Sequence, residues 1–128
     1  MDDRSVTGLI GVYDADGGVL GELAYVWGKV RGTRHCSLCD LTHGRLPWRR
    51  PEWDRMVADL GLTVDLLHVN EMPPEVRRAV AACGVPVVLA RTTAGLRPLV
   101  VGAELDALDG SVARLSDLLR ARLSADRA

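Results

Sequence analysis

The chain has 128 residues, a length that fits one domain with a core large enough to fold without disulfides. Hydrophobic residues make up 48% and charged residues 26%, which excludes a disordered chain, and the formal net charge of -1 gives no reason to expect nucleic acid or a membrane surface as a partner. No apolar run approaches the ~20 residues of a membrane-spanning helix, and the acidic start of the chain is unlike a signal peptide. We therefore expect a cytoplasmic protein, in which three cysteines favour metal ligation or redox chemistry over structural disulfides.

The first half of the chain begins with a predicted strand and helix. Residues 9–13 are apolar and rich in β-formers, and residues 14–18 form a turn-like segment with two aspartates and two glycines. Apolar residues then recur at three- and four-residue steps, which predicts a helix over residues 18–30. Pro51 begins a second predicted helix, which has one apolar face and ends before Gly61.

The second half alternates strands and helices. The pattern predicts a strand over residues 62–69, a helix over 74–83, a hairpin of strands 85–90 and 96–101, and a helix over 111–123 that Ser111 caps. In the helix over residues 74–83 we expect Val76, Val80 and Ala81 to point inward. No repeat or linker divides the chain, so residues 1–128 are predicted to form a single domain.

This order of elements resembles the thioredoxin superfamily. Residues 84–87, Gly-Val-Pro-Val, are similar to the segment in which such proteins carry a cis-proline beside the active site, and residues 92–95 match the tip of their hairpin. Residues 100–102 resemble the last strand and the glycine after it, and the match spans residues 9–123. The resemblance implies an α/β fold whose central mixed sheet has about four strands, with helices on its faces.

A Cys/His segment departs from that family's pattern. Residues from about 32 to 50 show no amphipathic stripe and are interpreted as an insertion that holds His35, Cys36, Cys39 and His43. Thioredoxins place Cys-x-x-Cys directly after the first core strand, where this chain has residues 14–18 and no cysteine. The cysteine pair is displaced by about twenty residues, so the family's redox geometry is not carried over from the sequence.

Metal binding is the first interpretation of this segment. On a helix over residues 34–43, Cys36, Cys39 and His43 would lie along one face and could converge on one ion. Thiolate and imidazole ligands suit zinc, with copper or iron ranked below it. His35, Asp40 or the distant Cys83 would supply a fourth ligand.

Thiol–disulfide exchange is the second interpretation, and it would make the protein an enzyme. Cys36, preceded by His35, would attack a small-molecule or protein disulfide, and Cys39 would resolve the intermediate. His43 and nearby arginines would favour the thiolate. A third interpretation is that the cysteines are small buried apolar residues without a chemical role.

The charge pattern adds a non-catalytic alternative. From residue 29 to residue 50 the chain has six basic residues and a single acidic one, Asp40, so this loop would attract a small anionic substrate or an acidic protein partner. An adaptor with a basic, tryptophan-containing loop fits that pattern.

His68, near the end of a predicted strand, is interpreted either as a core or edge histidine or as a ligand.

Overall fold

The structure is a computed structural model that describes residues 6–14, 37–43 and 49–127. Its centre is a sheet of four strands, β1 (Val6–Val12), β2 (Thr63–Leu67), β3 (Val87–Thr92) and β4 (Gly95–Val100), in the order β2-β1-β3-β4. Strand β1 is parallel to β2 and antiparallel to β3, and β3 and β4 form the predicted hairpin. The predicted α/β class with a mixed sheet of four strands is therefore confirmed.

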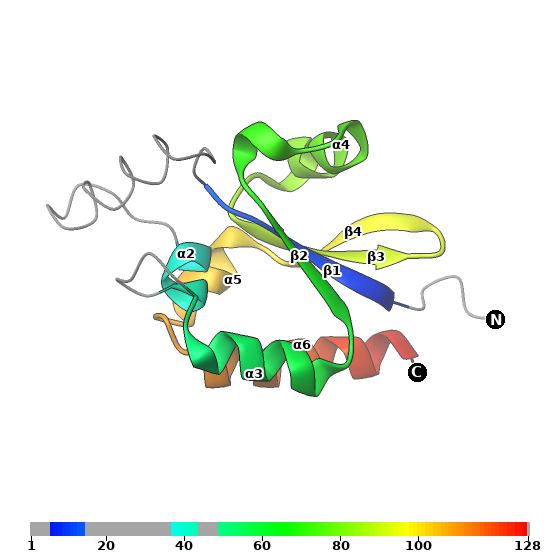
Figure 1. Ribbon diagram of the computed structural model, residues 1–128. Helices are drawn as coiled ribbons and strands as arrows, with labels where there is room; N and C mark the ends of the chain where they lie inside the picture. Colours follow the sequence, from blue (N-terminus) through cyan, green and yellow to red (C-terminus); the bar gives the residue numbers. More distant parts are fainter. Residues whose placement is uncertain (1–5, 15–36, 44–48, 128) are drawn as a thin grey trace, which may run out of the picture.

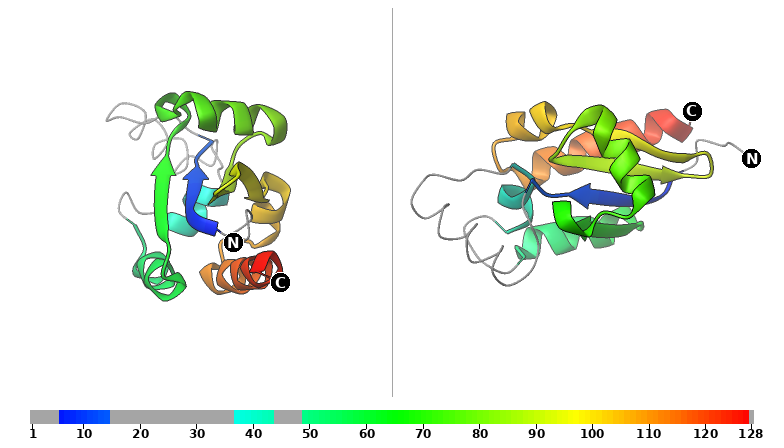
Figure 2. Two further views of the ribbon diagram at one scale, coloured as in Figure 1. Left: turned by 90° about the vertical axis from the view of Figure 1, so that its right-hand side faces the viewer. Right: turned by 90° about the horizontal axis from the view of Figure 1, so that it is seen from above.

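Helices cover both faces of the sheet (Figure 2). Helix α4 (Pro74–Cys83) lies on one face, and α3 (Pro51–Leu60) and α6 (Val112–Arg127) lie on the other. Two short helices, α2 (Ser37–Thr42) and α5 (Gly102–Ala107), pack side by side at one end of the sheet (Figure 1). A single 3₁₀ turn, η1 (Val69–Glu71), follows β2.

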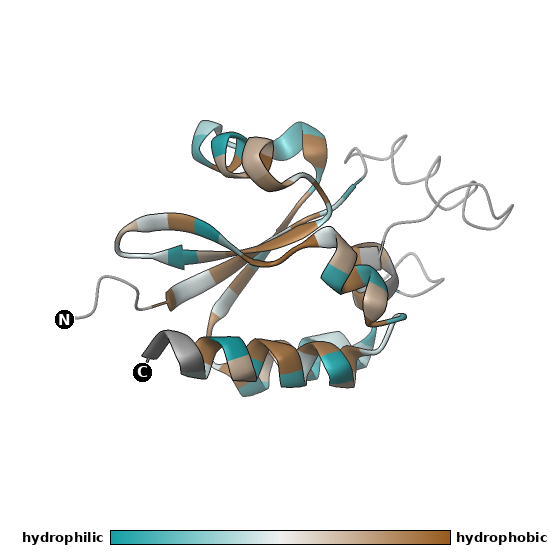
Figure 3. Cartoon of the chain, turned by 180° about the vertical axis from the view of Figure 1, so that it is seen from behind, coloured by the Kyte–Doolittle hydropathy of each residue, from teal (hydrophilic) through white to brown (hydrophobic). Residues whose placement is uncertain are grey.

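Strand β1 explains why the core has two parts. Its residues are buried on both faces, as in a central strand, and successive side chains point to opposite sides. Leu9 and Tyr13 join the cluster under α3 and α6, whereas Ile10 and Val12 join the cluster under α4. Figure 3 shows mainly hydrophobic residues along the central strands and an alternation of hydrophobic and hydrophilic residues along the helices. Burial of apolar surface on both faces is the main term that holds the layers together.

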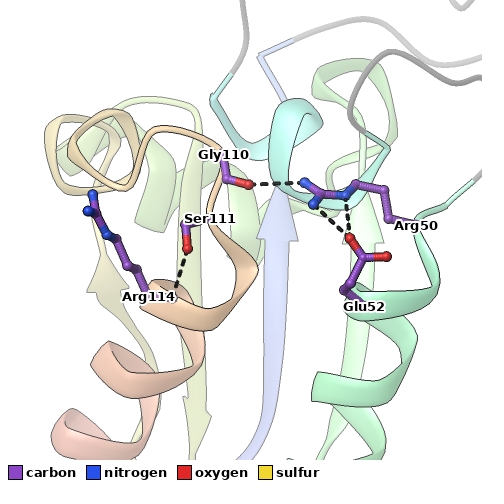
Figure 4. A network of polar contacts seen from close by, with 5 residues as sticks. All are labelled: Arg50, Glu52, Gly110, Ser111 and Arg114. Atoms are coloured by element: carbon purple, nitrogen blue, oxygen red, sulfur yellow. Dashed lines mark hydrogen bonds and ion pairs between the residues drawn. The ribbon is translucent and has the colours of Figure 1, made fainter.

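Local signals set the ends of the long helices. Pro51 occupies the first turn of α3, and Gly61 ends it in the left-handed conformation at φ 68°. The Ser111 hydroxyl accepts a hydrogen bond from the Arg114 N–H at 3.2 Å, which is the predicted cap of α6. Arg50 joins these two helix starts, because its side chain contacts Glu52 of α3 and donates to the Gly110 carbonyl at 3.0 Å (Figure 4).

Several expectations need correction or lie outside the described residues. Ala81 is exposed, because the inward face of α4 runs through Val76 and Val80, with Ala79 rather than Ala81 beside them. Strand β2 is shorter than predicted, since Val69 already belongs to η1. Helix α5 was not predicted. The helix expected over residues 18–30 falls outside the described ranges. The Val85–Pro86 peptide bond is cis, as the resemblance implies.

The helices within residues 6–14, 37–43 and 49–127 have no membrane-spanning candidate among them, because none combines the length and the apolar character needed to cross a bilayer.

Candidate functional site

The carboxyl ends of β1 and β2 bring two aromatic side chains together. These strands are parallel and adjacent, and the Tyr13 N–H extends the ladder by donating to the Leu67 carbonyl at 2.8 Å. Tyr13 and His68 therefore follow their strands at the same edge of the sheet, with ring centroids 4.9 Å apart. Polar groups collect at this edge in many α/β proteins, because side chains there follow the ends of buried strands.

Helix α2 lies against this same edge. A helix of six residues is not stable alone, and this one is held by Leu38 and Leu41, both fully buried in the cluster under α3 and α6. Gly11 of β1 leaves room for it, since a Cβ at Gly11 would lie 3.3 Å from Leu38 Cδ2. The chain thus returns to the end of β1 after the segment that separates the two elements in sequence.

Helix α2 also approaches the loop before β3. It packs against α5, and the first residue of α5, Gly102, lies close to Pro86. A Cβ at Gly102 would be 3.2 Å from the Pro86 carbonyl oxygen, so only glycine permits this approach without a shift of the backbone. The end of β1, α2 and the start of α5 therefore form one compact region.

A chain of hydrogen bonds links β1 to the end of α2. The Tyr13 hydroxyl donates to Thr42 Oγ1 at 3.0 Å, and Thr42 Oγ1 lies 2.7 Å from His43 Nδ1. Tyr13 is 2% exposed and Thr42 is fully buried, so little water competes for these groups. The rings of Tyr13 and His43 are 6.1 Å apart, which places both imidazoles, His43 and His68, around one phenol.

Glu71 fixes the second imidazole. Its Oε1 accepts the backbone N–H of His68 at 2.8 Å and lies 2.7 Å from His68 Nδ1. The hydrogen bond from the His68 backbone, followed by the one from its ring, holds the pKa of Glu71 below its usual value. An ionised Glu71 can only accept hydrogen bonds, so His68 Nδ1 carries a proton and the pair is a carboxylate–imidazole dyad.

The predicted site residues divide between described and undescribed segments. Cys39 is 6% exposed within the cluster under α3 and α6, and the His43 N–H donates to the Cys39 carbonyl at 2.9 Å. The helical conformation that the metal interpretation assumes is present over residues 37–42, and its last hydrogen bond extends to His43. His35 and Cys36 lie outside the described residues, and so do residues 29–34 and 44–48 of the basic loop.

Cys83 does not belong to this site. It packs against the cluster under α4, on the face of the sheet opposite the cluster that contains Cys39. Burial raises the pKa of the Cys83 thiol, which disfavours a thiolate ligand. The suggestion that Cys83 supplies a fourth metal ligand is wrong. Within the part of the chain that the structure describes, no group of three His, Cys, Asp or Glu side chains could hold a metal ion.

Two arginines of the basic segment are described, and both form ion pairs. Arg49 Nε lies 3.3 Å from an Asp54 carboxylate oxygen, and Arg50 is paired with Glu52 at 2.8 Å. The Arg50 N–H also donates to the Thr42 carbonyl at 2.6 Å, which ties α2 to the start of α3. These arginines hold the region together, and their charge is partly neutralised within the chain.

Tyr13, Thr42 and Glu71 were not predicted as site residues. Tyr13 had a usable signal, because it directly follows a buried strand at the edge where functional groups collect. Glu71 lies three residues after His68, a spacing at which a side chain can reach back to the start of a helical turn. Thr42 had no such signal, since its role depends on contact with a residue 29 positions away.

The comparisons with known proteins provide no relative for this chain. No protein-family model matches it, and neither the search of curated proteins nor the search of solved structures gave a significant match. Inferences about its function therefore rest on its own residues.

Proposed function

We propose that this chain is a thioredoxin-like domain that carries out thiol–disulfide exchange through Cys36 and Cys39. The observation that carries the proposal is the position of Cys39, which is buried on α2 in the same cluster as Tyr13 at the end of β1. The cysteine pair is far from β1 in sequence, but the helix that carries its second member contacts the end of that strand through Leu38 and Thr42. The sheet order β2-β1-β3-β4 agrees with the thioredoxin arrangement.

The burial of Cys39 favours distinct roles for the two thiols. A thiol that is 6% exposed is shielded from a bulky disulfide substrate but can attack a neighbouring mixed disulfide. We assign the first attack to Cys36, which precedes α2 by one residue in sequence. Its thiolate forms a bond to one substrate sulfur and breaks the substrate S–S bond. Cys39 then attacks the mixed disulfide, which releases the second substrate thiol and leaves Cys36 and Cys39 oxidised by two electrons.

Redox titration tests this function. The protein, equilibrated with mixtures of reduced and oxidised glutathione, is expected to form one intramolecular disulfide, detected by mass spectrometry after alkylation of the remaining thiols. Cys36→Ser and Cys39→Ser should each abolish that disulfide, and Cys83→Ser is the matched control that should retain it, because Cys83 lies on the other face of the sheet. A pair that stays reduced in every glutathione mixture would contradict the proposal.

Metal binding is the second candidate function, and one observation favours it. His43 follows Cys39 by four residues, and the hydrogen bond from the His43 N–H to the Cys39 carbonyl continues the helical turn. The two residues therefore lie on one side of α2. Cys36, three residues before Cys39, would extend this row, with His35 as a further ligand. Zinc is the metal that this set of sulfur and nitrogen ligands suits best.

Metal analysis separates the two candidates. If the ligand set binds zinc, protein purified without a histidine tag should hold about one equivalent, and Cys36→Ser or His43→Gln should lose it while Cys83→Ser keeps it. Under the redox proposal we expect less than about a tenth of an equivalent, with all three thiols reactive toward Ellman's reagent after denaturation. Stoichiometric zinc that blocks oxidation by glutathione would favour metal binding over thiol–disulfide exchange.

A further inference from the structure

The imidazole of His68 has one nitrogen that is held and one that is open. Its backbone N–H and its Nδ1 both contact Glu71 Oε1, at 2.8 and 2.7 Å, and its carbonyl accepts the Glu71 N–H at 2.9 Å. None of these bonds uses Nε2, which has no hydrogen-bond partner in the described part of the chain. The side chain is 22% exposed, and Nε2 is not a buried atom. Nε2 therefore faces solvent.

The contact between Glu71 and the ring goes beyond capping of the turn η1. To cap that turn, Glu71 needs only the bond from the His68 backbone N–H. The second contact fixes the imidazole, because an ionised Glu71 accepts the Nδ1 proton and leaves the lone pair of the neutral ring on Nε2. The buried Tyr13 ring, with its centroid 4.9 Å away, packs against the imidazole and limits its rotation.

We infer that His68 and Glu71 form a second reactive centre, in which Nε2 attacks the carbonyl carbon of an activated acyl group and Glu71 stabilises the positive charge that develops on the ring. A carboxylate–imidazole dyad commonly activates a serine or cysteine side chain. Within the described ranges no such side chain is hydrogen-bonded to Nε2, so the imidazole meets an incoming molecule directly. The dyad follows the carboxyl end of β2, where α/β sheets commonly bind ligands.

The atoms and charges balance in this reaction. Nε2 forms a bond to the carbonyl carbon, and the bond from that carbon to the leaving oxygen breaks. The acylated ring is a cation, which shares its Nδ1 proton with Glu71 at 2.7 Å. Water then adds to the acyl carbon, the C–N bond breaks, and the remaining proton of the water goes to the leaving oxygen. One ester and one water thus give one carboxylic acid and one alcohol, and no cysteine takes part.

Diethyl pyrocarbonate tests the nucleophile, because it transfers a stable ethoxycarbonyl group to neutral imidazoles. Peptide mass spectrometry of the full chain gives the rate at each histidine, at about pH 8, above the pKa of ~6.5 of a free imidazole. His68 should react faster than N-acetylhistidine amide in the same solution, although its side chain is only 22% exposed. An edge histidine without activation should react more slowly than this free compound, because the protein shields it.

Matched variants test the role of Glu71. Glu71→Gln keeps an acceptor for the His68 backbone N–H but removes the charge, and a charge-assisted hydrogen bond is the stronger one. The rate at His68 should fall by about 10-fold, which corresponds to a loss of ~1.4 kcal/mol of transition-state stabilisation. Glu75→Gln is the control, because Glu75 contacts Arg91 and should leave the rate unchanged. His43→Gln should also leave it unchanged.

Hydrolysis of 4-nitrophenyl acetate tests turnover. In a Cys36→Ser/Cys39→Ser/Cys83→Ser variant no thiol can be acylated, so hydrolysis above that of the free imidazole compound should remain and should be lost when His68→Gln is added. Urea unfolding shows whether the triple variant folds. If it does not fold, the pyrocarbonate rates of the wild type and Glu71→Gln decide.

Three results would count against this centre. A His68 rate at or below that of N-acetylhistidine amide overturns the nucleophile, and equal rates in wild type and Glu71→Gln overturn the role of Glu71. Ester hydrolysis that His68→Gln leaves unchanged in a folded protein overturns turnover. Because these measurements involve no cysteine, their failure leaves the proposed thiol–disulfide exchange untouched, and failure of that exchange leaves this centre standing.

Discussion

Leu38→Ala is expected to lower the free energy of unfolding by about 3 kcal/mol, within the range measured for buried leucines. The Leu38 side chain is 0% exposed and lies against β1 at Gly11. The six-residue helix α2 depends on such anchors, so the substitution should also loosen the segment that carries Cys39. Urea unfolding gives the change in stability, and the reactivity of Cys39 toward Ellman's reagent in a Cys36→Ser/Cys83→Ser background reports exposure of α2.

The matched control for this prediction is Leu38→Met. It conserves the side-chain volume and should cost less than about 1.5 kcal/mol. Cys39 should stay protected in Leu38→Met and react faster in Leu38→Ala. Equal stabilities of the two variants would show that Leu38 is not an anchor of this helix.

Glu104→Gln is expected to destabilise the protein by about 1–2 kcal/mol at pH 7. Glu104 forms a double contact with Arg122: Arg122 Nη1 donates to Oε1 at 2.8 Å, and Arg122 Nη2 contacts Oε2. The Val101 N–H also donates to Oε1 at 3.1 Å, and Arg122 donates to the Leu99 carbonyl at 2.6 Å. These contacts of Glu104 and Arg122 therefore join the end of β4, the start of α5 and helix α6.

The pKa of Glu104 gives this prediction a pH dependence. Arg122, and after it the Val101 N–H, lowers that pKa from 4.5 to about 2, a shift equivalent to roughly 3 kcal/mol. Because the side chain is 34% exposed, solvent screening reduces the expected contribution to about 1–2 kcal/mol. A lowered pKa in the folded state stabilises the protein above the unfolded value of 4.5, and the contribution disappears as the pH falls from there to about 2.

Urea unfolding between pH 2 and pH 7 tests this dependence. The difference in stability between wild type and Glu104→Gln should be full at pH 7, shrink below pH 4.5 and vanish near pH 2. Glu75→Gln is the matched control, because the exposed pair of Glu75 with Arg91 is long, at 3.4 Å, and should contribute well under about 1 kcal/mol. A difference that is constant over this pH range would contradict the role of the Glu104 carboxylate.

The long elements could be predicted because each carries its own signal. Helix α4 begins at Pro74 and ends at Cys83 as expected, since a proline at the first turn and a glycine after the end mark its limits. The hairpin of β3 and β4 follows from two apolar runs around a short turn. Such signals are local, so they can be read without knowledge of the partners in space.

The short helix α5 could not be predicted, because it carries no local signal of its own. Helix α5 has six residues and begins directly after β4, so it shows too few turns for a periodic pattern. Its position depends on the close approach of Gly102 to Pro86 and on the contact of Glu104 with Arg122. The exposure of Ala81 has a different cause, because the inward face of α4 follows the helical spacing from Val76 to Ala79, Val80 and Cys83, and Ala81 falls outside that spacing.

The sequence by itself determined the α/β class, the long helices and the concentration of reactive residue types between His35 and His43. Only the tertiary structure decided that α2, which carries Cys39, lies against the end of β1, that Cys83 lies on the other face of the sheet, and that Tyr13 and Thr42 contact His43. The physical reason is that helical and strand periodicity is set by neighbours along the chain. Burial and hydrogen bonding at the site join residues that are close only after the layers have packed.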